Sequence, residues 1–154
     1  MNFYQKMILF LATGFFSGKA KIVPGTIGTL AGIPFVLLFK IIPMSFHLIY
    51  GVVFVLAAVF IADKAAEIMG EEDPGCIVID EMAGYVIALS LVPVQVSTLV
   101  AGFFIFRFFD IMKPGPVRYF ERNFSGGAGI VLDDVMAGAF TAFGLKIIYL
   151  SGAF

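Results

Sequence analysis

Acidic residues are absent from the first 62 positions of this chain, where the only charged side chains are four lysines. The chain also has one cysteine, Cys76, and one histidine, His47. A single cysteine excludes an internal disulfide framework, and no paired Cys/His pattern is present for zinc. The net charge of −1 leaves no basic face of the kind that binds nucleic acid. We therefore expect neither a zinc or thiol enzyme nor a nucleic-acid partner.

Charged residues of both signs are few. They make up 14% of the chain, whereas apolar residues make up 60%, with nineteen Phe and a mean hydropathy of +1.02. Soluble domains carry about 25% charged residues, so the composition favours a membrane protein. The alternative is an unusually apolar soluble helical protein. The length predicts one domain, residues 1–154.

Six apolar runs are too long for strands and lack strict alternation, which predicts helices. They are Met7–Phe16, Ile27–Ile42, Phe46–Ala62, Met82–Val94, Ser97–Phe109 and Val135–Leu150. Pro34 should kink the second run or delay its start. The first run has no clean cleavage site after it, so we interpret it as retained. The predicted fold class is all-α, a multihelical membrane-embedded bundle.

The connections between these runs alternate in character. Three are long and hold nearly all the charges, namely Ser17–Thr26, Asp63–Asp80 and Asp110–Asp134, whereas the joins at 43–45 and 93–96 are short and uncharged. A chain that crosses a membrane back and forth would gather the charged connections on one side. Their Lys and Arg residues place that side in the cytoplasm.

Every Asp and Glu lies between Asp63 and Asp134, beside strongly apolar sequence. Charges in such surroundings are costly unless they are paired, solvated or bound to a metal. Proteins hold hard divalent cations with several carboxylates in one small region. The pattern therefore predicts a metal-dependent site at a membrane surface.

The segment Ile22–Thr29 opens an apolar run with a Pro-Gly turn. Thr26 could cap the helix, and backbone N–H groups near Gly28 would form a seat for an anion. Ordinary turn chemistry explains the same residues. Positive charge for a phosphate could come from the two lysines just upstream, Lys19 and Lys21.

Two pairs of adjacent acids are predicted at helix starts. Asp80 and Glu81 interrupt an apolar run where a helix begins. Two explanations of this position are equally good: stabilisation of the carboxylates by the helix dipole, and a role as metal ligands. In Ser125–Asp134, three glycines permit a backbone nest for an anion, after which Asp133 and Asp134 open the last helix.

Three charged residues are spaced to share one face of a helix. Arg107, Asp110 and Lys113 follow the spacing i, i+3 and i+6, and Pro114 and Pro116 should end that helix. The stripe is either a surface ion pair at an amphipathic helix end or a carboxylate on a metal flanked by two cations that bind phosphate.

Established phosphate-handling motifs are missing. Met82 stands six residues after Cys76, where a Cys-dependent phosphatase has Arg, and there is no Gly-rich phosphate loop ending in Lys-Ser/Thr. His47 lies in an apolar run, at the uncharged end of its helix, so histidine-based phosphoryl transfer is not expected. The remaining chemistry is metal-activated water or a carboxylate nucleophile.

Four segments in order, Pro24–Leu30, Ile77–Gly84, Phe106–Pro116 and Gly126–Asp134, resemble the phosphatidylglycerophosphatase A family over nearly the whole chain. The resemblance implies an all-α, Mg²⁺-dependent lipid phosphatase of the bacterial inner membrane. Such an enzyme removes the terminal phosphate of phosphatidylglycerophosphate and leaves phosphatidylglycerol. It also implies membrane lipid as a partner, and the family has soluble relatives of less certain substrate.

The residues assigned on this basis form two sets. The predicted catalytic residues and Mg²⁺ ligands are Asp80, Glu81, Asp110 and Asp134, with Asp133 as a further ligand or support. The predicted phosphate-binding residues are Thr26, Gly28, Thr29, Arg107 and Lys113. Water deprotonated by a carboxylate, or an aspartate itself, would attack phosphorus, and the sequence leaves both open.

Two functions of other classes stay open. An ion-coupled transporter subunit would spread its acids through the depth of the helices, and a non-catalytic lipid-binding protein would not need the metal. Whether the chain forms a homo-oligomer is also open.

Overall fold

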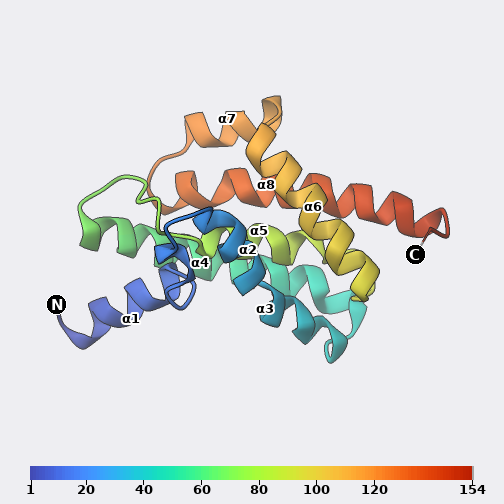
Figure 1. Ribbon diagram of the computed structural model, residues 1–154, viewed down its shortest axis with the longest axis horizontal. Coiled ribbons are helices and arrows are strands. Elements are labelled where there is room, and N and C mark those ends of the chain that lie inside the picture. The colour runs from blue at the N-terminus through green and yellow to red at the C-terminus, as the bar shows by residue number, and fades with distance from the viewer. Residues whose placement is uncertain (154) are drawn as a thin grey trace.

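The computed structural model describes residues 1–153, the side chain of Glu121 excepted. All regular structure in that range is helical, which confirms the predicted all-α class (Figure 1). The α-helices are α1 (Phe3–Ala12), α2 (Pro24–Ala31), α3 (Ile33–Leu37), α4 (His47–Met69), α5 (Ile79–Ala88), α6 (Val96–Met112), α7 (Gly115–Asn123) and α8 (Gly126–Leu150). Short 3₁₀ turns span Ser17–Lys19, Leu38–Lys40 and Met44–Phe46.

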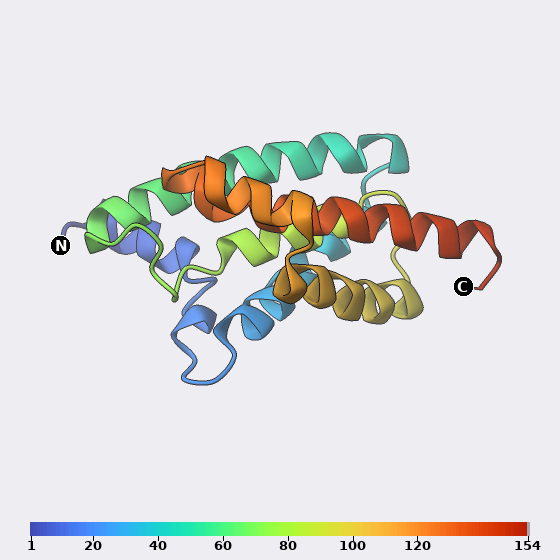
Figure 2. The same ribbon diagram turned by 90° about the horizontal axis from the view of Figure 1, so that it is seen from above.

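The long helices α4 and α8 run along the long axis of the molecule and pack against the central helix α5 (Figures 1 and 2). Helix α1 packs on α4, α2 and α3 pack on α5, and α6 and α7 pack on α8. Within α5 all residues except Asp80 and Glu81 are buried. Only the two acids at the N-terminal end of the central helix are therefore partly accessible.

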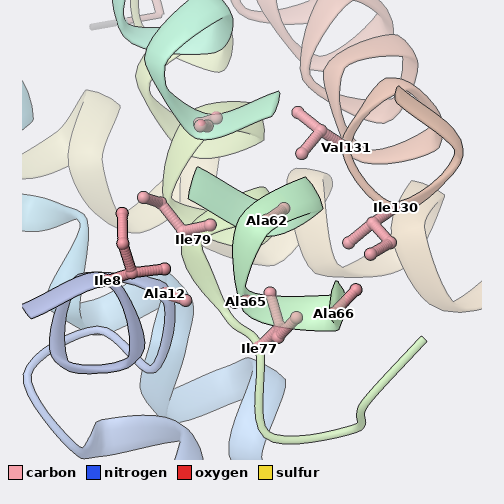
Figure 3. Packing of buried hydrophobic residues seen from close by; sticks show 11 residues of the cluster. Ile8, Ala12, Ala62, Ala65, Ala66, Ile77, Ile79, Ile130 and Val131 are labelled. Carbon is pink, nitrogen blue, oxygen red and sulfur yellow. The ribbon is translucent and has the colours of Figure 1, made fainter. Parts of the chain in front are cut away.

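Small side chains let α4 lie close to its neighbours. Ala62, Ala65 and Ala66 of α4 pack against Ile77 and Ile130 in one of the two hydrophobic clusters (Figure 3). Apolar surface removed from water in this way stabilises the fold by about 25 cal/mol per Å². Because alanine projects little beyond the backbone, α1, α5 and α8 can all contact the same helix.

A close backbone approach joins α5 to α8. A Cβ atom on Gly138 would collide with the carbonyl oxygen of Gly84, and one on Gly84 would lie 2.6 Å from the carbonyl oxygen of Asp134. Asp80 precedes Gly84 by four residues and Asp134 precedes Gly138 by four, so each acid lies one turn from the glycine on the same helix face. The glycine contact thus brings the two carboxylates together.

Several helix boundaries differ from the prediction, since α1 (Phe3–Ala12) ends before Phe16 and α5 (Ile79–Ala88) ends before Val94. The run Ile27–Ile42 forms two helices that meet at Gly32, just before Pro34, so the expected interruption at this proline is confirmed. Helix α4 continues to Met69 and ends at Gly70, whose φ of +71° suits glycine. Asp63, predicted to begin a loop, therefore lies on a helix.

The segment after Lys113 contains a helix that the prolines concealed. Pro114 precedes α7 and Pro116 lies in its first turn, where proline does not disturb a helix. The predicted glycine nest stays a prediction, and Gly126 has a φ of +62°. Helix α8 begins at Gly126, so the expectation that Asp133 and Asp134 open this helix is wrong. The reason is a tertiary contact, since the Gly127 N–H donates to Asp63 Oδ1 at 3.0 Å and so secures the start of α8 against α4.

The charged connections gather at one end of the molecule. The ends of α4 and α6 lie there with the starts of α5 and α8, whereas the joins at 43–45 and 93–96 lie at the opposite end (Figures 1 and 2). Met44–Met69 and Gly126–Leu150 are long and apolar enough to cross a membrane by length and composition. The buried half of the second is also what a core helix would show.

Candidate active site

Three carboxylates from two helices converge at the charged end. Asp80 and Glu81 occupy the first turn of α5, and Asp134 faces them from α8. Each offers an oxygen atom, and these atoms all lie within 4.8 Å of one another. The Glu81 backbone N–H donates to Asp80 Oδ1 at 2.9 Å, so the start of α5 stabilises one of the three negative charges.

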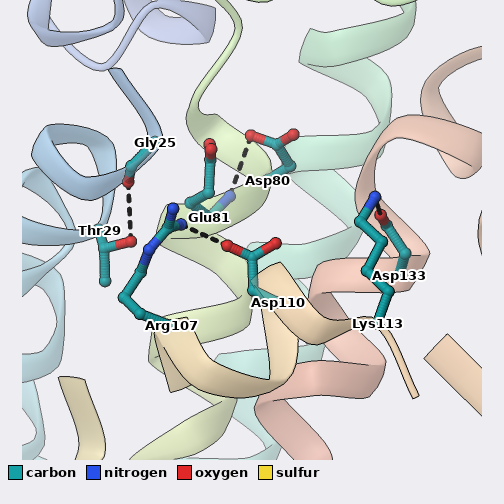
Figure 4. Close-up of polar contacts among 8 residues, drawn as sticks. All are labelled: Gly25, Thr29, Asp80, Glu81, Arg107, Asp110, Lys113 and Asp133. Carbon is teal, nitrogen blue, oxygen red and sulfur yellow. Dashed lines mark hydrogen bonds and ion pairs between the residues drawn. The ribbon is translucent and has the colours of Figure 1, made fainter. Parts of the chain in front are cut away.

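Two further acids flank this cluster, each with a cation. Asp110 forms an ion pair with Arg107 on α6, and Asp133 on α8 forms one with Lys113, with Nζ 2.9 Å from Oδ2. Figure 4 shows the Arg107 guanidinium beside Glu81 and Asp110, with the second pair on the other side of the site. The structure therefore gathers all five predicted acids with two of the predicted cations, Arg107 and Lys113.

Burial raises the pKa of Asp80 well above its ordinary value, and repulsion from the Glu81 carboxylate adds to the shift. Burial also raises the pKa of Glu81, where repulsion from Asp110 adds to the shift and the Arg107 charge opposes it. Crowded acids that are costly to ionise gain most from a cation placed among them.

The donor set fits a hard divalent cation. Glu81 Oε2 is buried and has no hydrogen-bond partner among the described residues. A buried oxygen without a partner lowers the stability of the folded protein. A cation held by the Asp80, Glu81 and Asp134 carboxylates would satisfy it, because Mg²⁺ prefers carboxylate oxygen ligands. Arg107 Nε is likewise buried without a partner in the described part of the chain.

The cluster opens into a cavity of about 840 Å³. Besides the site acids, its lining includes five acids that the prediction did not assign to the site: Asp63, Glu67, Glu71, Glu72 and Asp73. The sequence carried a signal for these acids, because Glu71, Glu72 and Asp73 are consecutive and lie in a charged connection. The lining also includes Pro24 and Gly25 of α2, so the N-terminal end of this helix forms one wall.

The structure does not bring the remaining predicted phosphate ligands into this cavity. Thr29 is fully buried, and its hydroxyl donates to the Gly25 carbonyl at 2.9 Å (Figure 4). Gly28 is buried against Val78, where a Cβ atom would lie 2.5 Å from the valine Cβ. Thr26 lies inside α2 and does not cap it, because the residue before the helix is Val23. Gly28 and Thr29 therefore serve packing.

Lys19 and Lys21 also lie outside the lining of the cavity, and both are exposed. The Lys19 ammonium lies 4.9 Å from the centre of the Phe16 ring. Of the predicted cations, only Arg107 and Lys113 therefore stand at the carboxylates.

Comparison with known proteins gives consistent matches. A family model described as phosphatidylglycerophosphatase A matches residues 10–149. Phosphatidylglycerophosphatase A of Escherichia coli is 41% identical over 143 residues, covering 92% of this chain and 81% of that protein. The Haemophilus influenzae protein of the same name is 41% identical over 129 residues, covering 82% and 79%.

A relative with a different name matches about as well. A protein of Bacteroides thetaiotaomicron, named as a candidate phosphatidylinositol-3-phosphatase, is 40% identical over 139 residues, covering 85% of this chain and 86% of that protein. Among solved structures, none matches this chain. The family model and these long alignments agree, and this chain belongs to the phosphatidylglycerophosphatase A family.

Proposed function

We propose that this protein is a Mg²⁺-dependent lipid phosphatase that hydrolyses the terminal phosphate of phosphatidylglycerophosphate to give phosphatidylglycerol. Membership of the family supports the substrate. The observation that carries the mechanism is the convergence of Asp80, Glu81 and Asp134 within 4.8 Å in an open cavity, with two cations beside them.

Asp80, Glu81 and Asp134 would hold the metal, with Asp110 and Asp133 as neighbouring carboxylates. When bound, Mg²⁺ supplies positive charge that stabilises the transferring phosphoryl group and activates water. Two positively charged residues accompany five carboxylates here, so the protein alone leaves the site negative. A phosphate dianion would be repelled without an added cation.

Arg107 and Lys113 would bind the phosphate oxygens. Both are partly buried and held in place by Asp110 and Asp133, so little side-chain freedom is lost when a phosphate arrives. The free Nε–H of Arg107 is an available donor for it. Charge-assisted hydrogen bonds of this kind are worth about 1.5–3 kcal/mol each.

Hydrolysis consumes one water, breaks the ester P–O bond and releases the lipid alcohol and inorganic phosphate. Asp110 lies beside the cluster and is suited to take the proton from the attacking water. This proton then passes to the leaving alkoxide oxygen. The other route has an aspartate attack phosphorus, with water cleaving the acyl phosphate afterwards. Both routes need Asp110 or its neighbours ionised.

The outer surface of the fold supports a membrane location. The exposed side chains of α4 from Leu48 to Phe60 are all apolar, among them Val52 and Leu56, and a contiguous surface of this kind is costly in water. With α4 and α8 spanning the bacterial inner membrane, the charged end would face the cytoplasm. The acids lie at that end and are not spread through the helices, which disfavours an ion-transport pathway.

The test is phosphate release by the purified protein in lipid nanodiscs, with Mg²⁺ and with EDTA. Phosphatidylglycerophosphate should be hydrolysed only with Mg²⁺, and Asp110→Asn should reduce the rate at least about a hundredfold. Glu67→Gln is the matched control, since this exposed acid lines the same cavity and pairs with Lys64. Release that continues in EDTA would overturn the metal-dependent mechanism.

The Bacteroides thetaiotaomicron relative gives a second candidate substrate, phosphatidylinositol 3-phosphate. Its phosphate is also a monoester on a lipid headgroup, and the same carboxylates and cations would act on it. Assaying both lipids at equal surface concentration decides between them. A higher kcat/KM for the inositol lipid would identify that lipid, and not phosphatidylglycerophosphate, as the preferred substrate. The proposed mechanism would be unaffected.

A further inference from the structure

The segment between α1 and α2 presents large apolar side chains to the outside, beside the cavity. Phe15, Phe16, Ile22 and Val23 are all exposed, Ile22 by 77% and Val23 by 58%. We call these four side chains, with the segment 15–23 that holds them, the apolar loop. The loop leads directly into Pro24 and Gly25, which line the cavity, and Figure 2 shows this part of the chain projecting beyond the helices.

The exposure is imposed by the backbone. Phe15, Phe16 and Val23 are three of the four non-glycine residues with positive φ among those described, at +59°, +71° and +47°. This conformation is unfavourable for aromatic and β-branched residues and persists only where the surroundings enforce it. Backbone hydrogen bonds do so here, including Phe15 N–H to the Phe10 carbonyl at 2.9 Å and Gly18 N–H to the Thr13 carbonyl at 3.0 Å.

The loop is also attached to the start of α5. The Val78 N–H donates to the Ala12 carbonyl at 2.9 Å, just before the apolar loop begins. Gly18 packs so closely on the Cys76 carbonyl oxygen that no side chain would fit there. Because Val78 directly precedes α5, the loop is fixed relative to Asp80 and Glu81.

The charge of the loop selects the partner. Lys19 and Lys21 are exposed between the two apolar pairs, and no acid occurs in the first 62 residues. Apolar side chains together with lysines match the border of an anionic bilayer, where acyl chains meet phosphate groups. Lysine side chains near such a surface are attracted by its negative charge.

We propose that the apolar loop is a membrane-interface anchor, which inserts its four apolar side chains at the level of the lipid headgroups of an anionic bilayer. Lys19 and Lys21 bind the phosphate groups there. The anchor holds the neighbouring cavity at the depth where a lipid phosphomonoester lies. The inference rests on the proposed function for its reason, but the first arm of its test, a measurement of membrane depth, needs no activity.

The chain contains no tryptophan, so a single introduced indole reports its own surroundings. Ile22→Trp is the probe of the loop, Leu56→Trp marks the outward face of α4, and Glu72→Trp marks the acidic side of the cavity. All three positions are exposed. Each variant is placed in nanodiscs of phosphatidylcholine with phosphatidylglycerol, whose acyl chains carry bromine either near the headgroup or near the bilayer centre.

The expected result is a depth order. Trp at position 22 should be quenched more by bromine near the headgroup, Trp at position 56 more by bromine near the centre, and Trp at position 72 by neither. Quenching at position 56 without quenching at position 22 would overturn the anchor and leave the membrane-spanning assignment intact. Quenching at position 22 without quenching at position 56 would overturn the assignment of α4 as a membrane span and would still support the anchor.

A second arm separates the anchor from the fold. Val23→Asn removes the apolar side chain and keeps a residue that tolerates positive φ, and it is combined with Ile22→Ser. The pair should raise KM for phosphatidylglycerophosphate in nanodiscs several-fold with kcat unchanged, and it should leave Tm within a few degrees. An unchanged KM would contradict the role of the anchor in placing the cavity.

Discussion

At the scale of single residues, the decisive feature is that acids are buried where they are costly. Burial raises the pKa of Asp80 in the protein above its value in the unfolded chain. The unfolded chain therefore releases this proton at lower pH than the folded protein does. Folding thus loses stability as pH rises from the ordinary pKa of an aspartate, about 3.9, through the raised one.

Asp80→Asn should consequently stabilise the metal-free protein. At about pH 8 its Tm in EDTA should exceed that of the wild type by a few degrees, and the difference should shrink as pH falls below about 3, where Asp80 is protonated in both states. Activity should be lost in the same variant. Thermal scans across pH measure the effect, and a lower Tm at all pH values would contradict the burial argument.

The approach of α2 to the cluster gives a second residue-scale prediction. A Cβ atom on Gly25 would collide with a Glu81 carboxylate oxygen and lie 3.2 Å from Arg107 Nη1. Gly25→Ala should therefore displace both groups and reduce kcat/KM about tenfold or more. Gly75→Ala is the control, because Gly75 lines the same cavity and its Cβ would meet no described atom within 4 Å. Equal rates in the two variants would contradict the assignment of Glu81 and Arg107 to the active site.

The sequence predicted the charged residues of the site and failed on the neutral ones. Asp110 and Arg107 lie at the site as predicted, because charges beside apolar sequence must be paired, solvated or bound to a ligand. Thr29 and Gly28 lie in another of the four family segments, Pro24–Leu30, yet they are buried in the interior. A small residue can allow close packing of helices or can leave room for an anion. Only the neighbours in the structure, here Val78, distinguish these two roles.

At the scale of elements, the pairing of α5 with α8 sets the distance between Asp80 and Asp134. The two helices run in the same direction (Figures 1 and 2), so their carboxylates and glycines lie in matching register. The sequence could not reveal this contact, because Gly84 and Gly138 carry no pattern that distinguishes them from other glycines. The boundaries of α8 were missed for a related reason, since its start depends on Asp63.

Gly138→Ala should therefore separate α5 from α8. The added methyl group meets the Gly84 carbonyl oxygen, and overpacking of this kind costs about 1–3 kcal/mol. Tm should fall and activity should fall with it. Gly144→Ala on the same helix meets nothing within 4 Å among described residues and should be neutral or stabilise by up to about 1 kcal/mol. Similar effects of the two changes would show that the contact does not matter.

At the scale of the whole molecule, the alternation of charged and uncharged connections predicted the arrangement well. The two short uncharged joins lie at one end and the charged connections at the other, because apolar helices that reverse direction must sort their ends in this way. The extra helix α7 and the length of α4 escaped prediction, since their charged sequences resemble loops.

The charged end as a whole should respond to pH through the metal. Protons and Mg²⁺ compete for Asp80 and Glu81, whose pKa values burial raises. As pH falls, more of these carboxyls keep their protons, so the Mg²⁺ concentration for half-maximal activity should rise. Rates measured at several pH values and Mg²⁺ concentrations test this, and a half-maximal concentration that does not change with pH would contradict it.

The most direct test is a Mg²⁺ titration of phosphate release from phosphatidylglycerophosphate by the wild type, Asp134→Asn and Glu67→Gln in identical nanodiscs. The wild type and Glu67→Gln should saturate at similar Mg²⁺ concentrations and rates. Asp134→Asn should remain inactive, or need far more Mg²⁺, while it keeps the wild-type fold by circular dichroism. Full activity of Asp134→Asn at the wild-type Mg²⁺ concentration would contradict the assignment of this carboxylate cluster as the catalytic metal site.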